Sequence, residues 1–216
     1  MSSTAAGKPM RRAVSEADKA SRRHDILAAA KTVFAAQGYH ATTIADIARA
    51  AGVSYGSVYW YYESKEAVFH ELMSAEANAL RHHINRAVRA TPPKDGPSGP
   101  LSAAIQATLE FYETDRALVK LLFRDAFALG TPFEEHLSQI QGSFVDDAER
   151  LVVSLQRQGV LREGPSRVIA YSVISLVGQL AHRRLVADDG LSAEVLCDFV
   201  VDLLLRGLLA PSGVAA

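Results

Sequence analysis

Apolar side chains recur with the period of an α-helix along most of the chain, and no useful stretch alternates as a β-strand does. The first clear helical face is formed by Ile26, Leu27, Ala30, Val33 and Phe34. Gly38 follows where a glycine commonly ends a helix. Thr43 to Asp46 has a capping pattern, with Asp in place of the usual Glu, before a short amphipathic helix that Gly52 stops. The pattern predicts an all-α protein.

Glycine and proline divide the rest of the chain into further helices. One runs from Ser54 to about Tyr61, and Ser64 caps a longer one from Lys65 to about Ala90. The segment 91–100 holds four prolines and two glycines and is the one clear linker. Beyond it we expect helices over 101–113, 115–129, 132–158, 166–187 and 191–209. About nine helices and no sheet are predicted, with a kink or break conceivable at the interior Gly142.

Composition narrows the class of protein. A hydrophobic fraction of 49% and a charged fraction of 22% in 216 residues are ordinary for a globular protein. No apolar run is long enough to span a membrane, and residues 1–21 lack the apolar core of a secretory signal. The single cysteine, Cys197, excludes an intrachain disulfide. We therefore expect a cytoplasmic protein without a membrane partner.

Charge is distributed unevenly along the chain. Residues 1–65 carry nine Lys or Arg against five Asp or Glu, whereas residues 66–216 carry fourteen against nineteen. A basic first third suggests a head that binds a polyanion, although a difference of this size is also common on solvated surface.

Three small or branched residues have the spacing of a helix-turn-helix. Ala48 is small where a second helix would cross the first, Gly52 tolerates a positive φ at the turn, and Val58 can pack back onto the first helix. Ile47 and Val53 complete a small core. The same residues also suit an ordinary helical hairpin with a glycine turn, so this motif alone leaves both interpretations open.

A run of four aromatic residues, Tyr59 to Tyr62, strengthens the first interpretation. Four consecutive residues cannot all face inward on a helix, so we expect at least one or two of the rings on the surface. Hydroxyl and indole donors next to Lys65 at a helix N-terminus are suitable phosphate ligands. The alternative is that Tyr59 and Tyr62 pack inward and the others are there by chance.

Together these segments resemble a known family. They are similar to the DNA-binding domain of the TetR family of bacterial transcriptional regulators. The matching segments are Thr43 to Ala48, then Ala51-Gly-Val-Ser-x-Gly-x-Val-Tyr59, then Tyr62-x-Ser-Lys-Glu66. Tyr62 stands where the family usually has Phe. The resemblance covers about residues 22–70. It implies a ligand-controlled repressor that binds a palindromic operator as a dimer, with a recognition helix in each half-site.

The resemblance also implies roles for particular residues. Thr43 is expected to contact phosphate, Ser54 to Ser57 to face the major groove, and Lys65 to clamp phosphate. Tyr55 and Ser57 are the side chains best placed to reach base edges, and Gly56 allows a close approach to DNA or serves only packing. The full DNA-binding set is Thr43, Ser54, Tyr55, Gly56, Ser57, Tyr59, Trp60, Tyr61 and Lys65.

The remaining helices are expected to bury a core and to enclose a cavity for a mostly apolar small molecule. The candidates are the aromatic, long aliphatic and amide side chains of that region, although aromatics at helical spacing usually form core. They are Phe111, Tyr112, Leu118, Leu122, Phe123, Phe127, Phe133, Gln141, Phe144, Tyr171 and Gln179. No cofactor or metal is expected, since His82 and His83 are adjacent and cannot share a helical face as ligands.

A homodimer is expected through the last two helices. The segment 191–209 is apolar nearly all round, and one chain can cover only one side of it. The expected interface residues are Val173, Val177, Gly178, Phe199 and Leu203. We thus divide the chain into a disordered basic arm (1–21), a DNA-binding domain (22–65), a ligand-binding and dimerisation domain (66–210) and a tail (211–216).

Two alternatives to the ligand-responsive repressor remain open at this point. One is a DNA-binding regulator without a small-molecule ligand, and the other is an all-helical enzyme or carrier. Neither a Ser/His/Asp nor a Cys/His pairing suggests itself, and no glycine-rich phosphate loop is present. If a ligand acts, we expect it to act through the segment 65–90, the only covalent path between the two domains.

Overall fold

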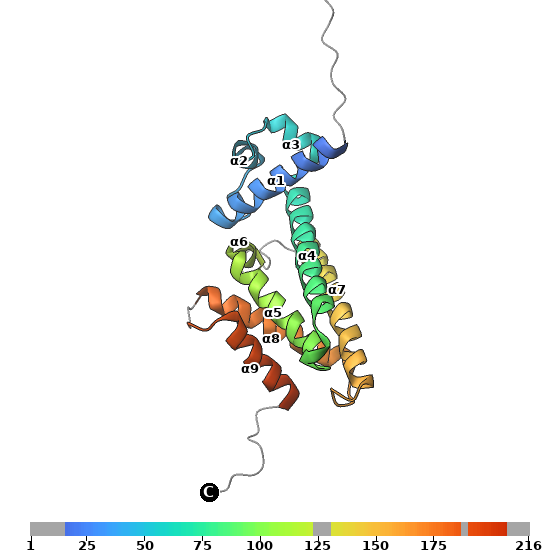
Figure 1. The fold of residues 1–216 in the computed structure, drawn as a ribbon. Coiled ribbons are helices and arrows are strands. Elements are labelled where there is room, and N and C mark those ends of the chain that lie inside the picture. Colours follow the sequence, from blue (N-terminus) through green and yellow to red (C-terminus); the bar gives the residue numbers. More distant parts are fainter. Residues whose placement is uncertain (1–15, 123–130, 187–189, 207–216) are drawn as a thin grey trace, which may run out of the picture.

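The computed structural model describes residues 16–122, 131–186 and 190–206, and these residues contain helices and no strand. Figure 1 shows a small head, formed by α1 (Glu16–Gln37), α2 (Ile44–Ala50) and α3 (Tyr55–Tyr61), above a larger helical body. The long α4 (Lys65–Ala90) leaves the head and runs down through the body. The predicted all-α architecture, with a three-helix head before the helical body, is confirmed.

The body is built from helices that the predicted punctuation separates. After a short 3-10 helix (Pro93–Asp95) come α5 (Gly99–Thr114), α6 (Arg116–Lys120), α7 (Thr131–Arg157), α8 (Ser166–Val186) and α9 (Ala193–Arg206). Helix α5 packs along α4 and against α9, while α7 packs along α8. The described residues thus form nine α-helices, and α7 is a single helix that continues through Gly142.

Several boundaries differ from the sequence-based expectation. In the segment expected to be one helix over 115–129, α6 spans Arg116–Lys120, and α9 begins at Ala193 rather than at 191. Helix α1 begins at Glu16, within the segment predicted to be a disordered arm. Its first turns carry no apolar face, but Glu16 and Asp18 suit a helix N-terminus, and Lys19 Nζ lies 2.7 Å from Glu16 Oε1. Helix α5 begins at Gly99, inside the predicted linker, where a Cβ would lie only 2.9 Å from Thr91 Cγ2.

The head and the upper body share a hydrophobic core. It joins Ile26, Phe34, Ile47 and Val58 of the head to Phe69 of α4, and all five side chains are fully buried. Leu118 of α6, Leu121 directly after it and Phe133 of α7 belong to the same cluster. A second cluster lies among α5, α7, α8 and α9 and includes Leu109, Leu155, Cys197 and Val200. The head therefore packs on the body as well as being linked to it through α4.

Candidate DNA-binding and ligand-binding sites

Helices α2 and α3 have the local geometry of a helix-turn-helix. Thr43 caps α2 in a complete capping box, in which its hydroxyl accepts from the Asp46 backbone N–H and Asp46 accepts from the Thr43 N–H. The Thr43 hydroxyl also donates to Asp46 Oδ2 at 2.6 Å, and this bond, followed by the one from the Thr43 N–H, lowers the pKa of Asp46. Ala48 and Val58 are buried where the helices meet, and Gly52 adopts φ +65° in the turn. The predicted pattern thus fixes the angle between the two helices.

Helix α3 presents its first residues to solvent. Ser54 caps the helix by accepting from the Ser57 N–H, and the two hydroxyls lie 2.7 Å apart. Tyr55 is 55% exposed, and its hydroxyl donates to that of Tyr59 at 3.3 Å. Gly56 is exposed with open space around it. Within the described residues, the side of α3 that carries Tyr55 therefore faces solvent.

The aromatic run divides between surface and core. Tyr59 and Trp60 are 44% and 64% exposed, Tyr61 is half-buried, and Tyr62 is buried in the head. The predicted surface exposure is confirmed, and of the two rings expected to pack inward in the alternative interpretation only Tyr62 does so. Lys19 of α1 lies over the Trp60 ring at 5.8 Å. The exposed Trp60 ring thus stands beside a basic residue of α1.

Lys65 has a different environment from the other predicted DNA-binding residues. Its ammonium lies within hydrogen-bond distance of three backbone carbonyl oxygens, those of Tyr39, His40 and Thr42, in the turn between α1 and α2. It also lies 4.3 Å from the centre of the Tyr39 ring. The side chain is half-buried and points toward the protein rather than away from it.

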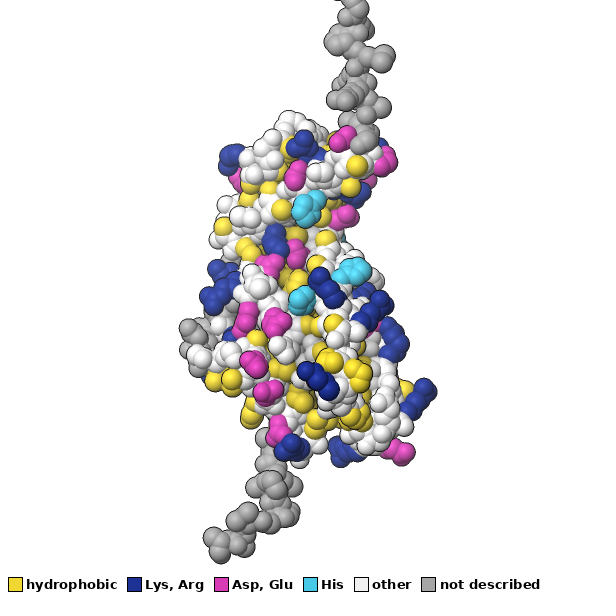
Figure 2. Space-filling model, in the orientation of Figure 1, with side chains coloured by type: hydrophobic (Ala, Val, Ile, Leu, Met, Phe, Trp, Pro, Cys, Tyr) yellow, Lys and Arg dark blue, Asp and Glu magenta, His cyan; other side chains and the backbone are white. Residues whose placement is uncertain are grey.

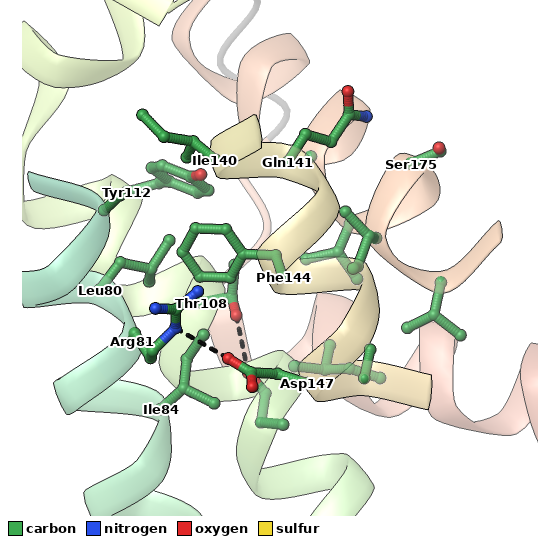
Figure 3. A pocket seen from close by; sticks show the side chains of 18 of the residues that line it. Leu80, Arg81, Ile84, Thr108, Tyr112, Ile140, Gln141, Phe144, Asp147 and Ser175 are labelled. Carbon is green, nitrogen blue, oxygen red and sulfur yellow. Dashed lines mark hydrogen bonds and ion pairs between the residues drawn. The ribbon is translucent and has the colours of Figure 1, made fainter. Parts of the chain in front are cut away.

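A cavity of about 710 Å³ lies in the body among α4, α5, α7 and α8. Its volume is within the range of small-molecule sites, and aliphatic side chains predominate in its lining. Tyr112 points toward it in Figure 3, and burial raises the pKa of this residue to about 12, so the phenol stays a neutral hydrogen-bond donor. The cavity can thus hold an apolar molecule with few polar groups.

Seven of the predicted ligand residues line this cavity. They are Tyr112, Leu118, Leu122, Gln141, Phe144, Tyr171 and Gln179. The prediction for Phe111 is corrected, since its ring lies outside the lining, against the head core and 5.9 Å from the ring of His83. Phe133 is likewise buried in the head core and not in the cavity. Phe123 and Phe127 lie outside the described residues.

The α4 wall of the cavity was missed in the sequence analysis. Its aliphatic residues recur at helical spacing and are Met73, Ala77, Leu80, Ile84 and Val88. Arg81 also points into the cavity region, where its Nε lies 2.8 Å from Asp147 Oδ2 of α7 and its guanidinium 5.3 Å from the Phe144 ring centre. Figure 3 shows this ion pair beside Phe144 and Ile84, among the apolar side chains of the lining.

A three-residue ion cluster joins the head to the body. Lys31 of α1 contacts Glu76 of α4, at 2.8 Å, and Asp115 between α5 and α6. Burial opposes its charge, but the hydrogen bonds to both carboxylates outweigh burial and raise the pKa of Lys31. Glu76 also lines the cavity, and Asp115 caps α6 by accepting from the Leu118 N–H. We call these three residues the Lys31 junction.

Helices α8 and α9 carry apolar side chains that the described part of the chain leaves exposed. Phe199 and Val195 of α9 are 58% and 52% exposed, while Leu203 is half-buried. Figure 2 shows hydrophobic side chains exposed on the lower half of the body. The residues predicted on α8 face inward instead, since Val173, Val177 and Gly178 line the cavity and Val177 is buried. Val168 and Tyr171 are the large apolar residues of α8 that are mostly exposed, and Tyr171 also borders the cavity.

The described parts of the chain contain neither a metal-binding cluster nor a membrane-spanning helix. No group of His, Cys, Asp or Glu there is arranged to hold a metal ion. Among the same residues, no helix combines the length and hydrophobicity that crossing a membrane requires.

Comparison with known proteins agrees with this geometry. Residues 26–72 match the model of the bacterial regulatory proteins of the tetR family. The chain is 25% identical over 211 residues to the transcriptional repressor BepR of Brucella suis, covering 95% of this chain and 99% of BepR. It is 30% identical over 144 residues to the repressor KstR2 of Mycobacterium tuberculosis, covering 65% of this chain and 67% of KstR2.

The fold also matches solved structures. The regulator FadR of Bacillus subtilis, crystallised with stearoyl-CoA, superposes with a TM-score of 0.78 at 18% identity, covering 86% of this chain and 99% of FadR. The helix-turn-helix head on a helical body defines the class, a DNA-binding transcriptional regulator rather than an enzyme. The chain belongs to the tetR family of bacterial regulatory proteins.

Proposed function

We propose that this regulator is a repressor that binds a palindromic operator as a homodimer and is released by a mostly apolar small molecule. The observation that carries the proposal is the 710 Å³ cavity, because one of its walls is α4, the helix that continues into the head. An occupant that presses on this wall acts directly on the element that leads to DNA.

Apart from Lys65, whose side chain points toward the protein, the predicted DNA contacts remain part of this proposal. Thr43 and Ser54 stand at the exposed starts of α2 and α3, and Tyr55 projects from the free side of α3. In helix-turn-helix dimers the recognition helices enter major grooves about 34–36 Å apart. The uncovered apolar residues of α8 and α9 supply a surface on which a second copy can hold two heads at such a spacing.

A long acyl chain is the first ligand to test. The cavity is lined mainly by aliphatic side chains, with the Arg81–Asp147 pair among them, which suits an apolar molecule that carries a polar group. The similar fold of FadR, crystallised with stearoyl-CoA, makes acyl thioesters a concrete choice of probe.

The test begins with a duplex selected from a random library by the full-length protein. Its binding is measured by fluorescence anisotropy while stearoyl-CoA, a shorter acyl-CoA, a free fatty acid or CoA alone is added. We expect the acylated compounds to release DNA and CoA alone to have no effect. By linkage, the operator should weaken ligand binding by the same factor.

A variant that fills the cavity separates specific release from non-specific effects. Thr108 lines the cavity on α5, and Thr108→Phe should abolish release while leaving DNA binding intact. Thr114→Phe, the same change at the exposed end of α5, is the control. Release that persists in Thr108→Phe would contradict this binding site. If no compound releases the DNA, the regulator without a small-molecule ligand becomes the better description.

A further inference from the structure

The side chain of Lys65 is saturated by partners within its own chain. Its Nζ lies 2.8 Å from the Tyr39 carbonyl oxygen, 2.9 Å from that of Thr42 and 3.4 Å from that of His40. An ammonium has three N–H donors and no acceptor. Three acceptors therefore use all of its donors, and none is left for a phosphate oxygen without breaking a bond to the turn.

A second hydrogen bond joins the same two segments, the turn between α1 and α2 and the start of α4. The Tyr39 hydroxyl donates to Glu66 Oε1 at 2.8 Å, and its ring lies under the Lys65 ammonium. Tyr39 is 7% exposed and Thr42 only 1%, so both stand firmly in the head. The hydrogen bonds around Glu66, first to its own backbone N–H and then to Tyr39, lower the pKa of this carboxyl group.

The tied turn sets the position of the helix-turn-helix. Thr42 directly precedes Thr43, the residue that caps α2. Lys65 and Glu66 are the first two residues of α4. The start of α2 is thus fixed to the start of α4 by charge-assisted hydrogen bonds, which are among the stronger kind.

We propose that Lys65 is a positioning residue, which acts on DNA binding by holding the α1–α2 turn against α4 and not by contacting phosphate. This role differs from the phosphate clamp that the family resemblance implies. It rests on the DNA-binding function, but its first test needs no DNA. The hydrogen bonds of Lys65 also connect α4 directly to the start of α2, so that a displacement of α4 moves the helix-turn-helix.

The experiment uses Lys65→Met, which keeps the aliphatic stem and removes the ammonium, in the full-length protein. Lys94→Met is the control, because Lys94 is exposed in the 3-10 helix remote from the head. Without DNA, hydrogen exchange of the α2 amides should be about tenfold faster or more in Lys65→Met and unchanged in Lys94→Met, given the strength of hydrogen bonds to charged groups.

The salt dependence of DNA binding tests the other half of the proposal. The probe is the selected duplex, or a short duplex of arbitrary sequence if selection yields none. Lys65→Met should bind more weakly, with an unchanged slope of log K against log salt. A phosphate contact in each subunit of a dimer would instead reduce the slope by about 1.8.

Either of two results would overturn the proposal: a slope reduced by about 1.8, or α2 exchange equal to that of the parent protein. If Lys65→Met does not fold, Lys65→Arg takes its place. Its planar guanidinium cannot direct three donors from one nitrogen at the three carbonyls, so α2 should still exchange faster at an unchanged slope. A phosphate-binding Lys65 predicts parental exchange in Lys65→Arg.

Discussion

Removing the cation of the Lys31 junction should weaken both DNA binding and its response to ligand. Lys31→Met leaves Glu76 and Asp115 facing each other without the ammonium that lies 2.8 Å from Glu76. The three side chains are only 23%, 16% and 19% exposed, so water compensates poorly. One α1–α4 contact and one contact to the α5–α6 corner are lost together.

The size of the effect follows from this geometry. Two unit charges at 2.8 Å attract by about 6 kcal/mol at an effective dielectric constant of 20. Desolvation of the two charges cancels most of this attraction. An ion pair that is neither fully exposed nor fully buried contributes about 2 kcal/mol net. If the junction holds the DNA-competent orientation of the head, its loss lowers operator affinity by up to about 30-fold.

The assay compares operator affinity with and without the releasing ligand, by anisotropy on the selected duplex. Lys31→Met should lower affinity without ligand and shrink the further loss that ligand causes. Glu76→Gln should have a smaller effect, since Asp115 still pairs with Lys31. Glu71→Gln is the matched control: it removes an α1–α4 ion pair with Arg23, at 3.2 Å, whose side chains are 47% and 44% exposed.

One result would refute this account of the junction. If Lys31→Met lowers thermal stability but leaves the ratio of affinities with and without ligand unchanged, the junction only stabilises the fold. A double-mutant cycle between Lys31→Met and Glu76→Gln then measures the pair energy itself. A coupling energy near zero would show that the estimate of about 2 kcal/mol is wrong.

Three further predictions concern other parts of the molecule. Phe199 lies on the exposed face of α9, so Phe199→Asp should give a folded monomer in sedimentation at micromolar concentration. Val200 is fully buried, so Val200→Asp should unfold the chain; a dimeric Phe199→Asp would argue against this interface. Burial and then the neighbouring His136 lower the pKa of His70, so the unfolded chain binds the proton first as pH falls. Thermal stability should therefore drop as pH decreases through about 6.5. The variant His70→Asn should flatten that drop. Gly52→Ala should lower the free energy of unfolding in urea by about 1–2 kcal/mol, because φ at this position is +65°, although no atom lies within 4 Å of the new Cβ. Gly52→Asn should lower it less. Equal losses would point to a cause other than the backbone conformation.

The head could be predicted closely because its determinants are local. Ala48, Gly52 and Val58 each meet a steric requirement of the turn, and the hydroxyl caps Thr43 and Ser64 mark where helices begin. Four successive aromatics also force some rings outward whatever the tertiary fold. Helix ends in the body were similarly marked by glycine and proline, and only their exact positions moved.

The cavity was only partly predictable, since its lining depends on which helices meet. The row from Met73 to Val88 has the same periodicity as any core face, and nothing local says that the opposing wall stands away from it. Phe111 has the composition expected of a ligand contact, but packing assigns it to the head core instead. Likewise, Val177 looked suitable for a dimer stripe, yet α8 turns that side inward.

Lys65 shows why the role of a charged side chain is harder to infer from sequence than the position of a helix. Its partners are backbone carbonyls more than twenty residues earlier in the chain, and carbonyls leave no trace in the residue pattern. A lysine at the start of a helix therefore looks the same whether it faces DNA or its own chain. Only the fold, which brings the turn after Gly38 to the start of α4, separates the two.

Helix α4 is where the functional features of the molecule converge. Its first residues, Lys65 and Glu66, hold the turn before α2, Glu76 pairs with α1, and the face from Met73 to Val88 forms a cavity wall. A rigid helix cannot shift at one of these places without straining the others. An occupant of the cavity therefore needs only to favour a slightly displaced α4, and its effect on DNA binding is limited by its preference for that displaced state.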